Sequence, residues 1–481
     1  MDLRDRFRGS LVGLAVGDAL GHPTEFMGSV SSIRSRWPPS GVTGFEPSGR
    51  HPAGTFTDDT QMSICVARAL IAAGQAPLDQ LMEVMSDEFT TWSRSAENNR
   101  APGGACMSGC SSLARGMHWR KAGVANSKGC GAAMRAAPVG LYFHLDDVAL
   151  VQVATAQSAP THRHPTGYAS SVAAAAAVAW AARGGDLEGL IDFTEASVRR
   201  LTPELLEEMG CEPELAASPG VREMLAALDA LRAAQDQEAE DVCHLLGGAW
   251  IGEEAVATAL WCVLRARGDF RDAVLRGANS SGDSDSIACI AGSVAGAMVG
   301  FDGIPSEWSQ SVEQGARLDA LARALHEAAQ GGGDRDPGSD LSFFTSRVAA
   351  VSVRTEELDE TDVDEMGDDT ADGMTSAADA DDDGPEMGDE ADATPPAPPG
   401  ELDGKRFFFA GPLLRAGDAV ARLRVTQLGG SVAGQLDTNV THFVVPEGAA
   451  ERLAPTVPPG VRIVTESELL GLLRLGQLPL F

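Results

Sequence analysis

The 481-residue sequence lacks several features that would indicate a membrane or secreted protein. Its longest runs of low charge, 168–182 and 287–301, are shorter than the ~20 apolar residues that a membrane-spanning helix needs. The first residues mix Asp with Arg, so we expect no secretory signal peptide. The eight cysteines form no Cys-x-x-Cys pair, which favours free thiols in a reducing compartment. We therefore expect a cytoplasmic protein without a membrane partner.

Basic residues are also scarce. Lys and Arg total 37 against 69 Asp and Glu, giving a net charge of -32, which argues against a surface that neutralises nucleic-acid phosphates. Residues 355–400 hold 18 acidic residues and no basic residue, whereas residues 401–481 are neutral, so over half of the net charge lies in one short stretch. One sign of charge, low hydrophobicity and a Pro-rich end predict a disordered, extended linker over residues 346–400.

Hydrophobic residues make up 43% of the chain, enough for a sizeable core. Ala-, Leu- and Val-rich segments at helical spacing recur through residues 1–345, and strand-like alternation is scarce there. We expect one large all-α domain in this part. From Leu402 the texture changes to KRFFFAG, GGSVAG, VTHFVV and VRIVTESELLGLL, which predicts a small α/β domain over residues 401–481.

Two acidic motifs each precede a helical run. Thr57, Asp58 and Asp59 precede a run over 61–73, and the second motif, Gly-Asp-Ser-Asp-Ser at 282–286, precedes a run over 287–299. Capping of a helix N-terminus explains one such side chain per motif, but each motif has two carboxylates. If the motifs meet in space, four carboxylates need a cation, and oxygen ligands favour Mg²⁺ or Mn²⁺. The sequence alone does not bring them together.

Three further motifs carry weaker signals. Glycines at 13, 17 and 21 predict a helix face made of small residues, which allows close packing, rather than a phosphate loop. The loop Asn-Ser-Lys-Gly-Cys-Gly at 126–131, placed before a helix, suits a diphosphate, although a plain glycine-rich turn fits equally well. Cys130 in this loop is expected to be a packed residue rather than a nucleophile. His162 and His164 have no Cys or carboxylate beside them, which argues against zinc.

Seven blocks, in order, resemble the ADP-ribosylglycohydrolase family, the group that includes dinitrogenase reductase-activating glycohydrolase. The resemblance covers about residues 5–320 and lies in GLAVGDALGHPTEF, GTFTDDTQM, ENNRAPGGAC, NSKGCGAAMRAAPVG, THRHP, LGGAWIGEEAVATALWC and GDSDSIACIAGSVAGAMVG. It implies an all-α orthogonal helical bundle whose central cleft holds two Mg²⁺ or Mn²⁺ ions. Residues 1–345 would then be the catalytic domain.

The resemblance also implies roles for individual residues. The metal ligands would be Thr57, Asp58, Asp59, Asp283, Asp285 and Ser286. The residues that bind ADP-ribose would be Gly103, Gly104, Ser127, Gly129, Gly131 and His162. Glu25 matches the mobile catalytic glutamate of the family and would handle water or the leaving group; with Asp58, Asp59, Asp283 and Asp285 it makes the expected catalytic set. The family more often has Thr at position 286, but Ser retains the hydroxyl.

The implied activity is hydrolysis of the glycosidic bond between ADP-ribose and a modified macromolecule, a protein or a nucleic acid. Three Lys against 34 Arg give a bacterial-looking composition, which favours ADP-ribosyl-arginine in a protein as the substrate. Two alternatives stay open. One is a catalytically inactive ADP-ribose-binding or structural relative, and the other is a dimetal phosphohydrolase.

The tail resembles a BRCT domain through LDGK at 402–405, the FFFAG turn, the SVAG and VTHFVV segments and the final VRIVTESELLGLL. This resemblance implies docking of a protein partner or a DNA end, with a scaffold or dimer contact as the simpler alternative. Ala410 stands where phosphate-binding members usually have Ser or Thr, which argues against phosphopeptide binding. A weak DNA contact would use Lys405, Arg406, Arg422 and Arg424.

Overall fold

The computed structural model describes residues 1–217, 220–331 and short segments between 402 and 469. It divides into two units, Met1–Ser352 and Val353–Phe481, which we describe separately. The predicted linker over 346–400 lies outside the described residues.

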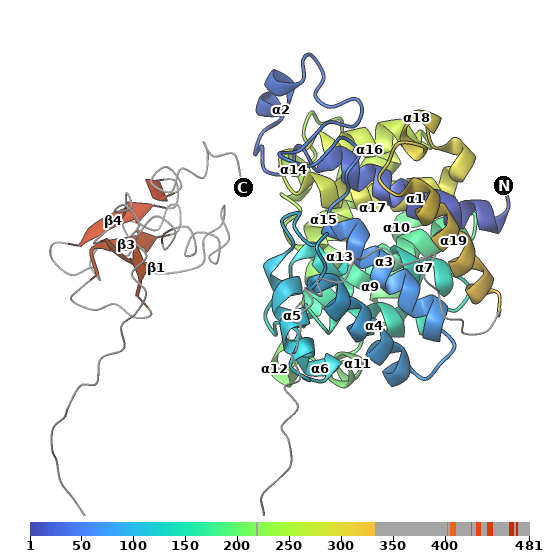
Figure 1. Cartoon of the computed structure of the whole chain (residues 1–481), viewed down its shortest axis with the longest axis horizontal. Coiled ribbons are helices and arrows are strands. Elements are labelled where there is room, and N and C mark those ends of the chain that lie inside the picture. The colour runs from blue at the N-terminus through green and yellow to red at the C-terminus, as the bar shows by residue number, and fades with distance from the viewer. Residues whose placement is uncertain are drawn as a thin grey trace, which may run out of the picture. The chain divides into compact units, whose positions relative to one another are not determined.

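The described part of the large unit is helical, with turns and isolated bridges between helices (Figure 1). Its longer helices are α1 (Leu3–Gly21), α3 (Asp58–Ala73), α4 (Leu78–Ser93), α5 (Gly104–Ala114), α8 (Asp147–Ser158), α9 (Pro165–Ala182), α13 (Gly220–Ala234), α15 (Gly252–Ala266), α17 (Ser284–Val299) and α19 (Gly315–Ala329). The shorter ones are α2 (Val30–Arg36), α6 (Trp119–Ala122), α7 (Ala137–Tyr142), α10 (Leu190–Val198), α11 (Pro203–Glu208), α12 (Pro213–Ala216), α14 (Cys243–Leu246), α16 (Phe270–Ala278), α18 (Ser306–Ser309) and the 3-10 turns η1 (Cys130–Ala132) and η2 (Phe301–Gly303). The predicted helical bundle is confirmed.

Helix α9 occupies the core because it is apolar on every face. It contains a run of alanines and valines, and all of its residues except Trp180 are buried. A helix that is hydrophobic on all sides is stable only when every side is buried in the protein core. Pro165 is its first residue, and His164 caps it by accepting a hydrogen bond from the Thr166 amide at 3.2 Å.

Helices α1 and α17 run side by side and pack closely through small residues (Figure 1). Gly13, Gly17 and Gly21 face α17. A Cβ at Gly17 would overlap the carbonyl oxygen of Ala288, and one at Gly21 would overlap the backbone of Asp285. The packing role predicted for these glycines is confirmed, and the close approach brings the end of α1 to the start of α17.

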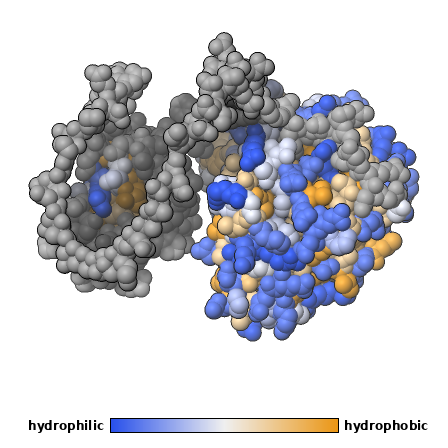
Figure 2. Space-filling model, turned by 60° about the horizontal axis from the view of Figure 1, so that its bottom comes forward, coloured by the Kyte–Doolittle hydropathy of each residue, from blue (hydrophilic) through white to orange (hydrophobic). Residues whose placement is uncertain are grey.

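The visible face of the large unit is mainly hydrophilic, with scattered hydrophobic residues (Figure 2). Among the described residues, no helix combines the length and the apolar character needed to cross a membrane.

The small unit contains a parallel sheet in the order β2-β1-β3-β4, formed by β1 (Arg406–Phe409), β2 (Ser431–Val432), β3 (His442–Val445) and β4 (Arg462–Thr465). These strands lie where the sequence predicts them. The small unit has its own hydrophobic core, which includes residues of the strands: Leu402, Phe407, Phe409, Val425, Val444, Val464 and Leu469. Ala410, Arg422 and Arg424 lie outside the described residues.

Candidate functional site

The two acidic motifs meet where three helix ends converge. Asp18 lies in α1, fully buried, and its carboxylate accepts hydrogen bonds from the backbone amides of Thr57 at 2.8 Å and Thr60 at 3.0 Å. These bonds fix the start of α3 against α1. Because α17 begins beside Gly21 of α1, the starts of α3 and α17 are brought together.

Hydroxyl groups link the carboxylates across the two motifs. Ser286 Oγ donates to Asp59 Oδ1 at 2.9 Å and to Oδ2 at 3.1 Å, and Thr57 Oγ1 donates to Asp285 Oδ2 at 3.2 Å. Capping accounts for Thr57, whose hydroxyl accepts from the Asp59 amide at 3.4 Å. It does not account for Asp283, which stands at the cap position of α17 but makes no side-chain capping bond.

Glu25 reaches this cluster from the turn that follows α1. Its amide donates to Gly21 O at 3.1 Å, and its side chain is 9% exposed. Carboxylate oxygens of Glu25, Asp283 and Asp285 lie within 4.8 Å of one another. Glu25 therefore lies in the same cluster as the two acidic motifs.

The electrostatics of the cluster favour a bound cation. Burial, and next the Asp285 carboxylate, raises the pKa of Asp18 to about 8 and also raises those of Glu25, Asp59 and Asp283 well above their usual range. Within residues 1–217 and 220–331, no ion pair to Arg, Lys or His neutralises these groups. Buried charges of one sign need a counter-charge, and a donor set of carboxylate and hydroxyl oxygens suits a hard divalent ion. The residues present thus fit the expected Mg²⁺ or Mn²⁺.

Gly103 adjoins the cluster, whereas Gly104 does not. The Gly103 amide donates to Asp58 Oδ2 at 3.1 Å, and this bond opposes burial, which raises the pKa of Asp58 to about 7. Gly104 is exposed at the start of α5, with open space where a Cβ would stand. Of the two glycines, only Gly103 contacts a predicted metal ligand.

The predicted substrate loop lies against His162. A Cβ on Gly129 would stand 3.2 Å from His162 Nε2, and one on Gly131 would stand 2.7 Å from His162 Cε1. The Cβ on Gly129 would also stand 3.8 Å from Ser127 Oγ. Burial, together with the Arg135 charge, lowers the pKa of His162 to about 3, so its imidazole is neutral at physiological pH. Because both glycines lack a side chain, the backbone of the loop can pack against this ring.

The helix expected directly after this loop is absent. The loop leads into η1, a 3-10 turn of three residues, and α7 begins only at Ala137. The expectation that a helix directly follows the loop was therefore wrong. The segment that follows the loop is rich in alanine, so in the sequence it resembles the start of a helix.

Three further residues of the site were missed or underrated in the sequence. Cys130 Sγ donates to Asp283 Oδ2 at 2.9 Å, joining the loop to the acidic cluster. Asp18 gave one signal, a lone carboxylate within an apolar, glycine-rich helix. Arg135 is fully buried and donates to Gln157 O at 2.7 Å and to Thr161 Oγ1 at 2.8 Å, beneath His162. Thr161 Oγ1 in turn lies 2.8 Å from His162 Nδ1.

His162 and His164 make separate contacts in the structure. His162 bonds Thr161, whereas His164 caps α9, and neither belongs to a group of metal-ligating side chains among the described residues.

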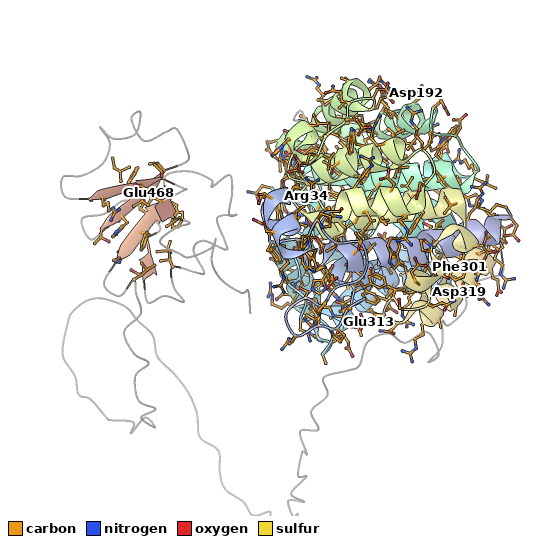
Figure 3. The ribbon with its side chains drawn as sticks, turned by 90° about the horizontal axis from the view of Figure 1, so that it is seen from above. Arg34, Asp192, Phe301, Glu313, Asp319 and Glu468 are labelled. Atoms are coloured by element: carbon orange, nitrogen blue, oxygen red, sulfur yellow. The ribbon has the colours of Figure 1, made fainter. Side chains whose placement is uncertain are left out.

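An ion pair supports the segment before α3. Arg100 donates to both carboxylate oxygens of Glu313 (labelled in Figure 3), at 2.6 and 2.8 Å. It also donates to the backbone oxygen of Phe56. Phe56 directly precedes Thr57, so this bidentate pair holds the entry to the acidic motif.

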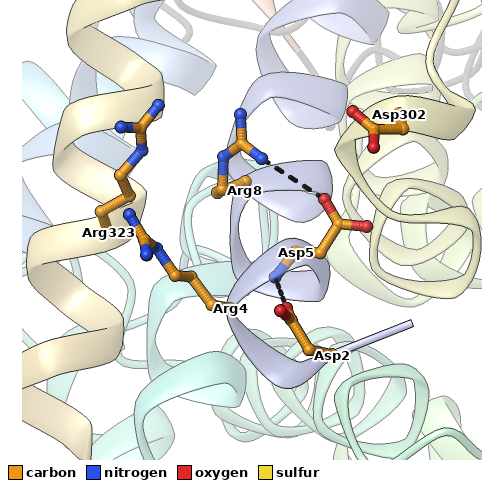
Figure 4. Close-up of a pocket in the computed structure, with 6 residues that line it drawn as sticks. All are labelled: Asp2, Arg4, Asp5, Arg8, Asp302 and Arg323. Atoms are coloured by element: carbon orange, nitrogen blue, oxygen red, sulfur yellow. Dashed lines mark hydrogen bonds and ion pairs between the residues drawn. The ribbon is translucent and has the colours of Figure 1, made fainter.

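A second charged hollow lies at the opposite end of α1. It has a volume of about 440 Å³ and is lined by Asp2, Arg4, Asp5, Arg8, Asp302 and Arg323 (Figure 4). Arg8 donates to Asp5 and to Asp319 of α19, and Arg323 pairs with Asp319 as well. Three of its lining residues are acidic and three are basic, and the ion pairs of Arg8 and Arg323 with Asp319 join α1 to α19.

Comparisons with known proteins agree with this geometry. A family model described as ADP-ribosylglycohydrolase matches residues 1–335, and one described as BRCA1 C Terminus (BRCT) domain matches residues 397–473. An uncharacterized protein of Archaeoglobus fulgidus is 31% identical over 330 residues, covering 68% of this chain and 97% of its own.

Relatives with named activities and a solved structure also match. ADP-ribosylarginine hydrolase Tri1 of Pseudomonas putida is 27% identical, covering 68% of this chain and 79% of its own. ADP-ribosylhydrolase ARH3 of Mus musculus is 29% identical, covering 68% and 92%. A solved structure titled ADP-ribosylglycohydrolase-related protein complex superposes with a TM-score of 0.52 at 25% identity, covering 68% of this chain and 99% of its own.

Proposed function

Because the chain belongs to the ADP-ribosylglycohydrolase family, we propose that it hydrolyses the bond between ADP-ribose and an arginine side chain of a modified protein. The observation that carries the proposal is the meeting of the α3 and α17 acidic motifs beside Glu25. The relatives named ADP-ribosylarginine hydrolase support the arginine linkage.

The cofactor we propose is a pair of Mg²⁺ or Mn²⁺ ions. Their ligands would come from the buried oxygens of Thr57, Asp58, Asp59, Asp283, Asp285 and Ser286. When bound, such ions orient and polarise sugar hydroxyls and lower the pKa of water. The hydrogen bonds of Asp18 and Arg100 hold the start of α3 in place for this task.

We assign the remaining residues to different parts of the substrate. Ser127, Gly129, Gly131 and the neutral, buried His162 lie next to one another, and we assign them to the diphosphate and ribose of ADP-ribose. Glu25 lies beside Asp283 and Asp285 and is our candidate for handling water or the leaving group. Hydrolysis breaks the bond between ribose C1″ and the guanidinium nitrogen, and water supplies a hydroxyl to C1″ and a proton to that nitrogen.

An inactive ADP-ribose-binding relative is the less favoured reading. Such a protein has no need to bury six carboxyl groups without ion pairs, because their mutual repulsion lowers stability. The complete set of acidic residues favours a hydrolase over a binding protein.

For the BRCT-like tail we propose a targeting role in the cytoplasm, through an undefined protein partner or a DNA end. Its match to a family model and its parallel sheet support a docking module. Lys405 and Arg406 are the described basic residues at the start of this module.

The test is a panel of four ADP-ribosylated substrates, linked through arginine, serine, nucleic acid or acetate, each with Mg²⁺, Mn²⁺ or EDTA. We expect release of ADP-ribose from the arginine-linked protein with a divalent ion and none with EDTA. Release from another linkage alone would contradict the arginine assignment, and full activity in EDTA would contradict the metal assignment.

A further inference from the structure

Two exposed aromatic side chains stand beside the acidic cluster. Phe26 is 51% exposed and Trp250 is 48% exposed, although most large hydrophobic residues of this unit are buried. Their rings stack with centroids 6.0 Å apart and planes 21° apart. They form an aromatic pair built from segments more than 200 residues apart in the sequence.

The backbone ties each ring to the cluster. Phe26 directly follows Glu25, whose carboxylate lies near Asp283 and Asp285. Trp250 O accepts from the Cys130 amide at 3.3 Å, and Gly248 O accepts from the Asp283 amide at 2.9 Å. The aromatic pair therefore adjoins the residues proposed to act on the scissile bond.

The turn that carries Trp250 is held in an unusual conformation. Ala249 has φ +64°, a value that residues with a side chain seldom adopt. Its amide donates to Glu254 Oε2 at 3.1 Å, which stabilises the turn from α15. Strain of this kind persists where the surrounding structure fixes it and often marks a functional position.

Resting on the proposed function, we propose that the Phe26–Trp250 pair binds the guanidinium of the ADP-ribosylated arginine and selects this linkage. A guanidinium is planar, permanently charged and weakly hydrated, so it stacks well on aromatic rings. The adjoining carboxylates of Glu25, Asp283 and Asp285 complement its charge. The serine, acetate and nucleic-acid leaving groups of the substrate panel offer no guanidinium cation.

The alternative occupant of the pair is the adenine of ADP-ribose. In ADP-ribose, the adenine is separated from C1″ by two riboses and two phosphates. Phe26, in contrast, is adjacent in the chain to Glu25, at the end of the site where the bond breaks. The position of the pair favours the leaving group.

The test compares Phe26→Ala, Trp250→Ala and Trp250→Phe in the full chain, with Leu145→Ala as a control at another exposed hydrophobic residue. We expect both alanine variants at the pair to lower kcat/KM for an ADP-ribosyl-arginine peptide about tenfold. Trp250→Phe retains a third or more, and Leu145→Ala is unchanged. The Kd of ADP-ribose, measured by calorimetry, shifts less than twofold in every variant.

Two results would overturn the inference. One is a kcat/KM within twofold of wild type in both alanine variants. The other is a tenfold loss of ADP-ribose affinity, which would assign the pair to ADP-ribose itself. Thermal unfolding checks that each variant is folded, which we expect because both rings are half-exposed.

A second measurement tests the charge of the bound group. Ethylguanidinium should inhibit the wild-type enzyme more strongly than ethylurea, its uncharged counterpart, and Trp250→Ala should reduce this difference. Equal inhibition by the two would contradict recognition of a cation. A wild-type enzyme that cleaves only another linkage refutes the proposed arginine linkage and this inference together, whereas an active enzyme with unaffected variants refutes this inference alone.

Discussion

At the scale of single residues, the site consists of buried carboxyl groups whose charges need a cation as counter-charge. Asp283 is 4% exposed and accepts a hydrogen bond from the Cys130 thiol, yet two of its close neighbours, Glu25 and Asp285, are themselves acidic. Each such carboxyl lowers the stability of the metal-free protein and raises its affinity for a cation.

Asp283→Asn separates these two effects. We expect turnover to fall on the order of 100-fold or more, and the rise in Tm on adding Mn²⁺ to shrink, because a proposed ligand is lost. The Tm without metal should not fall, because one source of repulsion is removed. The control is Asp192→Asn at an exposed side chain of α10 (Figure 3), which should leave all three values unchanged. Full activity of Asp283→Asn would contradict its assignment as a ligand.

His162 makes stability depend on pH. Its pKa is lowered to about 3 by burial, whereas unfolding restores the usual value of 6.5, so the unfolded state binds more protons below pH 6.5. Its contribution to stability is complete above pH 6.5 and is lost as the pH falls toward 3. Between pH 7 and pH 5 the loss from this group is about 2 kcal/mol.

Urea unfolding followed by tryptophan fluorescence measures this effect, since all seven tryptophans lie in the large unit. The decline in stability between pH 7 and pH 5 should be smaller in His162→Asn than in wild type by that amount. The exposed His118→Asn should behave as wild type. An identical decline in His162→Asn would show that this histidine does not titrate on unfolding.

At the scale of helices, the account depends on how closely α1 approaches α17. Glycines allow the two backbones to touch, and the site forms where that contact ends. The buried Asp18 then orients α3 on the same support. A shift of α1 would displace both acidic motifs at once.

Gly17→Ala tests this packing. The added Cβ would overlap the backbone oxygen and carbon of Ala288 in the facing helix, so we expect a loss of stability of roughly 1–3 kcal/mol in urea unfolding. The matched change Gly104→Ala meets open space at an exposed helix start and should alter stability by less than about 0.5 kcal/mol. Equal effects at both sites would contradict the close packing of α1 and α17.

Helices were the part of the fold most readily predicted from sequence, because hydrophobic spacing and length are local. The predicted runs over 61–73 and 287–299 are present, with starts at Asp58 and Ser284 that place the acidic residues at the first turn. The meeting of the two motifs could not be predicted, because it depends on packing through residues far from both. The Cys130–Asp283 bond was missed for the same reason, and the aromatic pair likewise joins distant segments.

At the scale of the whole molecule, two units of different architecture share one chain. The large unit holds every residue proposed for catalysis, whereas the small unit is a parallel sheet with its own core. The division of labour proposed above assigns the chemistry to the large unit and the targeting to the small unit.

Comparison of the full chain with residues 1–350 tests this division. We expect equal kcat/KM on a small ADP-ribosyl-arginine peptide, because every residue proposed for catalysis lies in the large unit. On a modified protein from the source cell, the shortened chain should act more slowly, at least threefold by rate of ADP-ribose release. Equal rates on both substrates would argue against a targeting role for the tail.

The central claim is that carboxylates from α3 and α17 jointly hold divalent ions at the ADP-ribose site. Anomalous diffraction from crystals grown with Mn²⁺ and ADP-ribose tests it most directly. The account predicts two manganese peaks within ligand distance of Asp58, Asp59 and Asp285, with the distal ribose against them. Crystals that show bound ADP-ribose but no manganese peak at these carboxylates would contradict it.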